Sequence, residues 1–431
     1  MNYRQNLIKI TLIIPILFGF FNSYRFGVDI PIMDEWVIIH MLRLFHEGLL
    51  PYDYLFQQHV AHIIFFPQII FLLTNQLIGY DSKIFMYISQ FLFLINLLII
   101  YLKISKQFKF KIANIPLWFI PIPFLIFSWR QLETMLSAFQ LTFAMALTFS
   151  LLTIYLLDRM AEDKYCIIFF LSILSVIIAS FSSAMGLIIW FSSLFQLILK
   201  KGLSHKTVYI CIWIVFGISS WIFYIIGLQE SNNALLQYTI NHPLYFIEYF
   251  LAVIGGGFYR VYLSITMGVI FLALFIILTI KIKNFRENAF WYSISLFSIF
   301  VSFFIACGRT YTGLPNALAA RYIPFSFLLI LSIYIFLVQF LFVKKNLSDN
   351  PKSLRRFNKA IITLTLIGSL ITYGIGYFYF GKMWFKEILH RKEILMNYKN
   401  MPDDSLQLLY PFPNYLKPNA KFWYEQKKSR K

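Results

Sequence analysis

Acidic and histidine side chains gather in residues 29–62, directly after the first long apolar run of the chain. Asp34, Glu35 and Trp36 form the most distinctive motif of this stretch. Because ionisable groups beside hydrocarbon cost free energy, their presence there points to a function. Asp34 is a candidate for a carboxylate base that takes a proton from an incoming nucleophile. The alternative is that Asp34 caps a helix and Glu35 complements the helix dipole, and the two roles are compatible.

Two histidines, His59 and His62, end the same stretch. If this segment is helical, their spacing places both on one face, as metal ligands or phosphate contacts. A histidine pair at a membrane interface is more often simply solvated, so a metal site stays open. Cys166, Cys211 and Cys307 lack paired spacing, which argues against a disulfide framework and a cysteine metal site.

A second polar stretch, residues 128–141, lies between apolar runs and has no basic flanks. It contains Arg130, Gln131, Glu133 and Gln140. Arg130 and Glu133 could simply pair with each other, as charges inside membranes usually do. We prefer the interpretation that this second carboxylate and a neighbouring amide lie over the same cavity as the first acidic motif.

Two late arginines, Arg309 and Arg321, have no acidic residue near them in the sequence. An unpaired guanidinium favours an anion, and its fork of donors suits a phosphate group. Arg260 follows the glycines 255–257, which we expect to be flexible, and is a weaker candidate of the same kind.

The composition identifies the class of protein that must position these side chains. Hydrophobic residues make up 59% of the chain, charged residues only 13%, and the mean hydropathy is +0.69. Apolar runs of about 20 residues recur along the chain, as expected for an all-α protein that crosses a membrane many times. The net charge of +19 does not indicate nucleic-acid binding, because lysines and arginines cluster between apolar runs, as in cytoplasmic loops.

The apolar runs predict about eleven transmembrane helices. Residues 63–78 are better placed in the interface or as a re-entrant segment, because all basic loops then fall on one side of the membrane. A short amphipathic helix beginning at Trp36 is expected to lie on the membrane surface. The predicted crossings are residues 7–24, 84–102, 113–129, 138–157, 165–181, 185–199, 207–228, 261–280, 288–307, 322–343 and 360–381.

This topology predicts one polytopic domain over residues 1–381, with a first external loop at 25–83. The basic and aromatic tail, residues 382–431, falls on the same external side. The polar stretches described above are external too, and so is the segment 229–260. All candidate functional side chains are therefore expected on one face of the membrane.

The order of these elements resembles that of bacterial membrane glycosyltransferases of the GT-C type, over about residues 1–345. Two departures are Val60 and Ala61 before the second histidine and Thr134 after the acid of the second stretch. The matching residues are Asp34-Glu35-Trp36, Gln58-His59 with His62, Gln131 with Glu133 and Gln140, and Gly308-Arg309 with Gly313, Ala317, Arg321 and Tyr322.

The resemblance implies transfer of a sugar from a polyprenyl-phosphate donor to an envelope glycan, lipid or glycopolymer. The reaction would occur at the outer face of the bacterial cytoplasmic membrane, with inversion at the anomeric carbon. Asp34 would be the base, with Glu35 or Glu133 orienting hydroxyl groups. The arginines 260, 309 and 321 would bind the donor phosphate. Further substrate contacts would come from Trp36, which could stack on sugar faces, His59, His62, Arg130, Gln131, Gln140 and Tyr322.

No cofactor is certain from these residues, and a divalent cation such as Mg²⁺ or Mn²⁺ is left open. The partners implied are the lipid-linked sugar, the acceptor and membrane lipids. A transporter or lipid flippase is the competing class, although transport needs a polar site near the membrane midplane, where this sequence has few charges. An O-antigen polymerase or ligase is a third class, but its large external loop is not evident.

Overall fold

The computed structural model describes residues 3–59, 62–160, 165–201, 205–226, 237–345 and 376–429, with a few positions between 360 and 374. Nearly all of this part of the chain is helical, and it contains no β-strand. The chain is therefore an all-α membrane protein, as the composition predicts. Within the residues described, seven helices are long and apolar enough to cross a membrane. They are α1 (Tyr3–Phe26), α4 (Ser82–Phe108), α7 (Leu141–Arg159), α11 (Lys206–Ile226), α14 (Val261–Ile282), α15 (Ala289–Arg309) and α16 (Ile323–Lys345).

Shorter elements connect and flank these seven helices. The α-helices are α2 (Glu35–His46), α3 (Phe65–Leu77), α5 (Pro121–Ile126), α6 (Leu132–Met135), α8 (Tyr165–Ser180), α9 (Ala184–Leu187), α10 (Ile189–Leu199), α13 (Pro243–Ile254), α18 (Lys382–Met396), α19 (Asp403–Gln407) and α20 (Pro413–Lys428). The 3-10 helices are η1 (Tyr54–Phe56), η2 (Ile112–Asn114), η3 (Leu117–Phe119), η4 (Trp129–Gln131), η5 (Thr310–Thr312), η6 (Leu314–Leu318), η7 (Ala320–Tyr322) and η9 (Tyr398–Asn400), and η8 (Gly376–Gly381) is a π-helix.

The predicted crossing at 113–129 is not one continuous helix. This segment consists of η2, η3 and α5, followed by the start of η4. Pro116, Pro121 and Pro123 explain the interruptions, since proline lacks the N–H that a helix interior needs. The predicted crossing at 360–381 lies largely outside the described residues.

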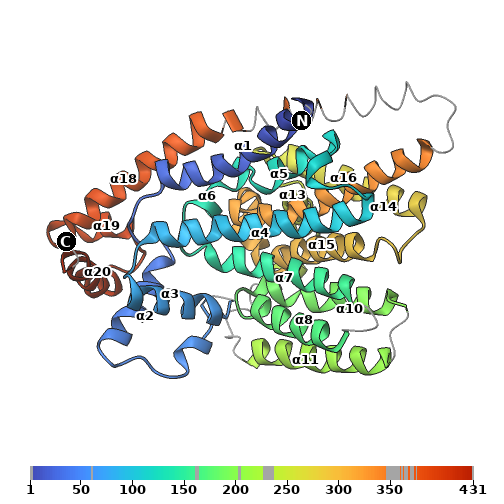
Figure 1. Cartoon of the computed structure of the whole chain (residues 1–431). Coiled ribbons are helices and arrows are strands. Elements are labelled where there is room, and N and C mark those ends of the chain that lie inside the picture. Colours follow the sequence, from blue (N-terminus) through green and yellow to red (C-terminus); the bar gives the residue numbers. More distant parts are fainter. Residues whose placement is uncertain are drawn as a thin grey trace.

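Two short apolar helices, α3 and α13, occupy segments predicted to be external. The 13 residues of α3 extend over only about 20 Å, less than the roughly 30 Å hydrocarbon core. Its length and its place beside α2 in Figure 1 favour an interfacial or re-entrant segment. Helix α13 packs directly on α14 and α15. A Cβ at Gly255 would overlap the carbonyl oxygen of Ser264, so this glycine permits close packing and does not serve as the flexible joint expected from the sequence.

The tail and the first external segment build a second hydrophobic core, separate from that of the helix bundle. It includes Trp36 and Leu42 of α2 together with Leu406, Leu416 and Trp423 of the tail. Figure 1 shows α2, α3, α19 and α20 gathered at one end of the molecule, which we call the α2 end. The tail thus lies at the same end of the molecule as the segment that contains α2 and α3.

Helix α2 forms where the sequence predicts it, but its apolar face does not lie on lipid. Ile38, Met41 and Leu42 are fully buried inside the protein. On its polar face, Arg43 Nε donates a hydrogen bond to Asn419 Oδ1 of α20 at 2.9 Å. Protein therefore covers both faces of this helix, because the distant tail supplies a partner for its polar side.

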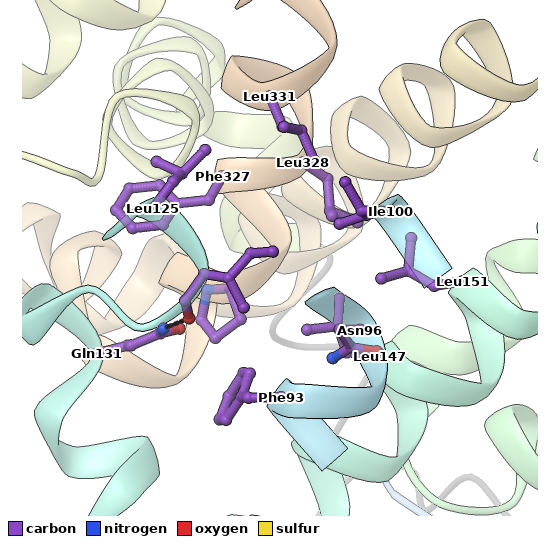
Figure 2. A pocket seen from close by; sticks show the side chains of 12 residues that line it. Phe93, Asn96, Ile100, Leu125, Gln131, Leu147, Leu151, Phe327, Leu328 and Leu331 are labelled. Atoms are coloured by element: carbon purple, nitrogen blue, oxygen red, sulfur yellow. Dashed lines mark hydrogen bonds between the residues drawn. The ribbon is translucent and has the colours of Figure 1, made fainter. Parts of the chain in front are cut away.

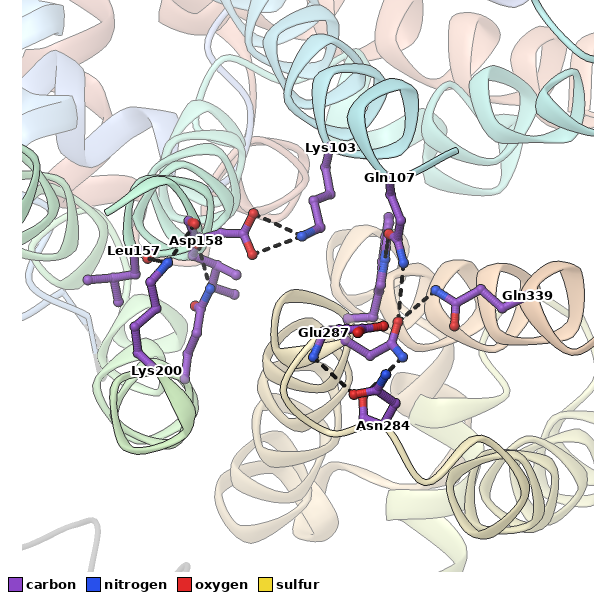
Figure 3. Close-up of polar contacts among 12 residues, drawn as sticks. Lys103, Gln107, Leu157, Asp158, Lys200, Asn284, Glu287 and Gln339 are labelled. Carbon is purple, nitrogen blue, oxygen red and sulfur yellow. Dashed lines mark hydrogen bonds and ion pairs between the residues drawn. The ribbon is translucent and has the colours of Figure 1, made fainter. Parts of the chain in front are cut away.

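The opposite end of the bundle carries the ends of α4, α7 and α10. Lys103 Nζ lies 2.8 and 2.9 Å from the two carboxylate oxygens of Asp158 (Figure 3). Lys200 Nζ donates to the carbonyl oxygen of Asp158 at 2.8 Å. The basic residues that follow these helices are thereby gathered at one end, as the predicted topology requires.

Candidate functional site

Four segments meet at the α2 end and carry most of the candidate side chains. They are the start of α2, the paired residues His59 and His62, the η4–α6 segment, and the connection between α15 and α16. The contacts and charge interactions that join them link Asp34 to the histidine pair and to Arg321, and link Arg321 to Glu133. Residues that are far apart in the sequence therefore form one ionic cluster.

The two histidines are not on a helix, contrary to the expectation from their spacing. His59 N donates to the His62 carbonyl oxygen at 2.8 Å, and His62 N donates to the His59 carbonyl oxygen at 3.0 Å. This reciprocal pairing of two extended residues sends the side chains to different partners. His59 faces the start of α2, whereas His62 reaches the start of α9.

Asp34 presents its carboxylate to solvent beside His59. Its side chain is 53% exposed, and Oδ1 lies 3.4 Å from His59 Nε2. It makes no capping hydrogen bond to α2, so the capping role considered from the sequence is not realised. Loss of solvent around the carboxylate opposes ionisation, but contact with His59 and the charge of Arg321 outweigh this effect and lower the pKa of Asp34. Asp34 is therefore ionised at neutral pH.

Glu133 pairs with Arg321, not with Arg130. Arg321 Nη1 lies 3.7 Å from Glu133 Oε1. Arg321 therefore has an acidic neighbour, although its sequence context suggested that it had none. Burial raises the pKa of Glu133, and the charges of Arg321 and Arg130 offset only part of that effect. Asp34 raises it further by like-charge repulsion. The pKa of Asp34 is thus lowered and that of Glu133 is raised, a difference that separates the roles of base and acid.

His62 is held as a neutral ring beside Arg309. Its Nδ1 accepts a hydrogen bond from the backbone N of Ala184 at 3.1 Å, so the proton of the neutral ring lies on Nε2. Burial, followed by the charge of Arg309, lowers the pKa of His62 to about 3. Within the described part of the chain Arg309 contacts no carboxylate, which leaves its guanidinium free to bind an anion.

Arg130, Gln131 and Gln140 are buried supports of the cluster. The Arg130 guanidinium lies 4.7 Å from the ring centre of Tyr259, and its Nη2 donates to the Leu318 carbonyl oxygen at 2.5 Å. Gln131 Nε2 donates a hydrogen bond to the Ile126 carbonyl oxygen at the end of α5. Gln140 precedes α7 and is buried. These side chains fix the segment that carries Glu133.

Two members of the first motif are inaccessible to a substrate. Glu35 is 0% exposed, and its oxygens accept hydrogen bonds from Tyr80 Oη, Ser82 Oγ, Ser137 Oγ and Ala138 N at 2.8–3.1 Å. Trp36 is also 0% exposed and lies in the second core, so it cannot stack on a sugar. Both expectations are corrected for the same reason: the tail and α4 enclose this side of α2.

Arg260 and Tyr322 occupy different surroundings. Arg260 is exposed where α14 begins, and among the described residues it contacts none of the clustered carboxylates or histidines. Tyr322 is buried, with its ring centre 5.1 Å from the Arg321 guanidinium. Tyr322 therefore supports Arg321, whereas Arg260 lies outside the ionic cluster.

The described residues contain no group of three or more metal-ligating side chains that could hold an ion. Inside the bundle, a cavity of about 20 Å³ is lined by Asn96, Gln131 and apolar side chains such as Phe93 and Leu328 (Figure 2). This volume is enough for about one water molecule. It is too small to hold a substrate.

Tyr410, in the tail, borders the site and was missed from the sequence. Burial raises the pKa of Tyr410, and the charge of Asp34 raises it further, which places the phenol close to that carboxylate. The aromatic composition of the tail was the available signal, but composition does not reveal which distant segment a tail contacts.

No known family model, curated protein or solved structure matches this chain. The ionic cluster itself is therefore the feature from which a function can be inferred. An ionised, accessible carboxylate, Asp34, lies within the field of Arg321, and Arg309, beside His62, has no acidic partner in the described chain. This arrangement can accept a proton at one point and bind an anion at another.

Proposed function

We propose that the chain is a glycosyltransferase of the GT-C type, which transfers a sugar from a polyprenyl-phosphate donor to an envelope glycan or lipid. About eleven crossings and an external active site at the α2 end belong to the same proposal. The observation that carries it is the ionised Asp34 carboxylate, exposed and held by His59 within the field of Arg321.

In this mechanism Asp34 takes the proton of the acceptor hydroxyl. The acceptor oxygen then attacks the anomeric carbon, and the bond between that carbon and the phosphate oxygen breaks. The bonding electrons leave with the phosphate, whose growing negative charge Arg309 and Arg321 stabilise. Glu133, through its contact with Arg321, keeps that guanidinium in place. Direct attack without a covalent intermediate gives inversion.

The membrane setting supports a lipid-linked donor. The cavity beside Asn96, inside the helix bundle, has room for only about one water molecule. A transporter or flippase needs a substrate site near the midplane, so this small volume favours chemistry at the α2 end. We therefore place the site at the outer face of a bacterial cytoplasmic membrane.

Mass spectrometry of surface glycans and lipid-linked sugars tests this proposal. We expect cells that lack the protein to accumulate one polyprenyl-phosphate sugar and to lose that sugar from a surface glycan or lipid. Reintroduction of the chain should reverse both changes. Glycan and lipid profiles that are identical with and without the protein would contradict the proposed function.

A further inference from the structure

Three tyrosines from two distant segments gather around His40 of α2, and one of them, Tyr410, lies within the field of Asp34. Tyr54 comes from the first external segment, and Tyr410 and Tyr415 come from the tail. The ring centres of Tyr410 and Tyr415 are 5.2 Å apart. The ring centre of Tyr54 lies 6.3 Å from that of His40, which places the third phenol in the same group.

These tyrosines are half-buried, and their hydroxyl groups are not used by the protein. None of the three phenolic oxygens hydrogen-bonds to another residue that the structure describes. At a half-buried position such a hydroxyl faces solvent, and it can both donate a hydrogen bond to a ligand and accept one from it. Three hydroxyls are therefore available to a ligand at this surface.

The tail is fixed against α2, so the tyrosines are held in place. The His40 ring lies 4.8 Å from that of Tyr415, and Asn419 Oδ1 contacts both His40 and Arg43 at 3.3 and 2.9 Å. Lys427 Nζ contacts the Asp29 carboxylate and donates to a backbone carbonyl oxygen at 2.8 Å. Contacts at both halves of α20 therefore anchor the tail.

Aromatic faces combined with free hydroxyl groups suit a ligand with an apolar ring face and many hydroxyls, such as a pyranose. We propose that Tyr54, Tyr410 and Tyr415 form a saccharide-binding subsite that presents an acceptor hydroxyl to Asp34. This inference depends on the proposed function and makes it more specific: the acceptor is a sugar of a glycan or glycolipid, and the tail selects it. A purely apolar lipid acceptor would leave the three hydroxyls without partners.

Saturation-transfer NMR on the purified full chain in detergent tests this subsite without requiring transfer. The probes are glucose, galactose, mannose and N-acetylglucosamine, added to the Asp34→Asn variant so that no turnover occurs. We expect ring protons of at least one sugar to receive magnetisation from tyrosine protons. Binding should weaken about tenfold in Tyr410→Ala and about threefold in Tyr410→Phe, which keeps the ring but loses the hydroxyl.

Tyr424→Ala is the control, because Tyr424 is an exposed tyrosine of α20, the helix that carries Tyr415 and that begins just after Tyr410. The control should bind the sugar as tightly as the Asp34→Asn variant without a tyrosine substitution. Equal binding by that variant and by the Tyr410 variants, or no binding of any probe, overturns the subsite. Tyr410→Phe keeps the test valid if Tyr410→Ala does not fold. If sugar binding depends on Tyr410 but cell glycans do not change when the protein is lost, the proposed function is overturned and the subsite is not.

Discussion

Asp34 and Glu35 are neighbours in the chain but have opposite environments. Asp34 is half-exposed, and the positive charge beside it favours its ionised form. Glu35 is enclosed, and burial raises its pKa to about 7 in spite of the donors around it. Adjacent residues thus have different roles. The Asp34 carboxylate is accessible for chemistry, whereas the Glu35 carboxylate joins α2 to the starts of α4 and α7.

Replacement of Glu35 should change stability and its dependence on pH. The pKa of Glu35 is about 7 in the native state against an ordinary value of 4.5. Between these two pH values the native state therefore binds more protons than the unfolded state. Stability therefore falls as the pH rises through that window. Glu35→Gln should remove this dependence and keep the fold. Glu35→Ala leaves four donors unsatisfied and should cost about 3 kcal/mol or more.

Thermal unfolding of the detergent-solubilised chain between pH 4.5 and 7.5 measures this effect. The slopes of melting temperature against pH for the wild type and Glu35→Gln should differ across that range. Parallel slopes would mean that Glu35 does not titrate there. Glu47→Gln, a change at an exposed acid near the end of α2, provides the control.

The sequence predicted the polar segments that matter but not how each residue is used. Asp34, Glu133 and Arg321 do come together, as their order along the chain suggested. The pattern could not distinguish Asp34 from Glu35, because their difference arises from Ser82, Ser137 and the backbone at 138. The burial of Trp36 and the non-helical backbone pairing of His59 with His62 were not foreseen, because both depend on tertiary contacts.

Helices were predicted best where the chain is uniformly apolar and worst where another element decides the outcome. Helices α4, α7, α14 and α15 coincide closely with predicted crossings. The short α13 was missed, since its 12 residues are too few for a crossing and its packing partners are remote in sequence. The tail helices lack an apolar run, so hydropathy carried no information about where they dock.

The contact between α13 and α14 should depend on two glycines. A Cβ at Gly255 would overlap the Ser264 carbonyl oxygen, and one at Gly268 would overlap that of Leu251. Because backbone atoms cannot move aside, Gly268→Ala should destabilise the chain by about 2 kcal/mol or more. Gly308→Ala is the control: no atom lies within 4 Å of its Cβ position, and alanine favours the helix by roughly 0.5–1 kcal/mol.

Melting temperatures in one detergent compare these variants. Gly255→Ala and Gly268→Ala should melt below the wild type, and Gly308→Ala at or above it. Melting of all three at the same temperature would show that α13 does not pack closely on α14.

The molecule as a whole is polarised. The Lys103–Asp158 pair and Lys200 lie at one end of the bundle (Figure 3), and the docked tail lies at the α2 end (Figure 1), where Arg321 and Glu133 pair. A second hydrophobic core joins the first external segment to the tail across more than three hundred residues of chain. Such a core closes one side of the site, and hydropathy alone does not predict it.

Asp34 provides the most direct test of the catalytic account, with Asp53→Asn as the matched control. Asp53 lies in the same external segment, where its contact is Gln57 Nε2 at 3.2 Å. In cells lacking the protein, the transferred sugar is quantified by mass spectrometry after each variant is expressed at equal membrane abundance. Wild type and Asp53→Asn should restore the sugar, whereas Asp34→Asn should lower transfer by about 100-fold or more. Restoration by Asp34→Asn to the level of Asp53→Asn would contradict the account.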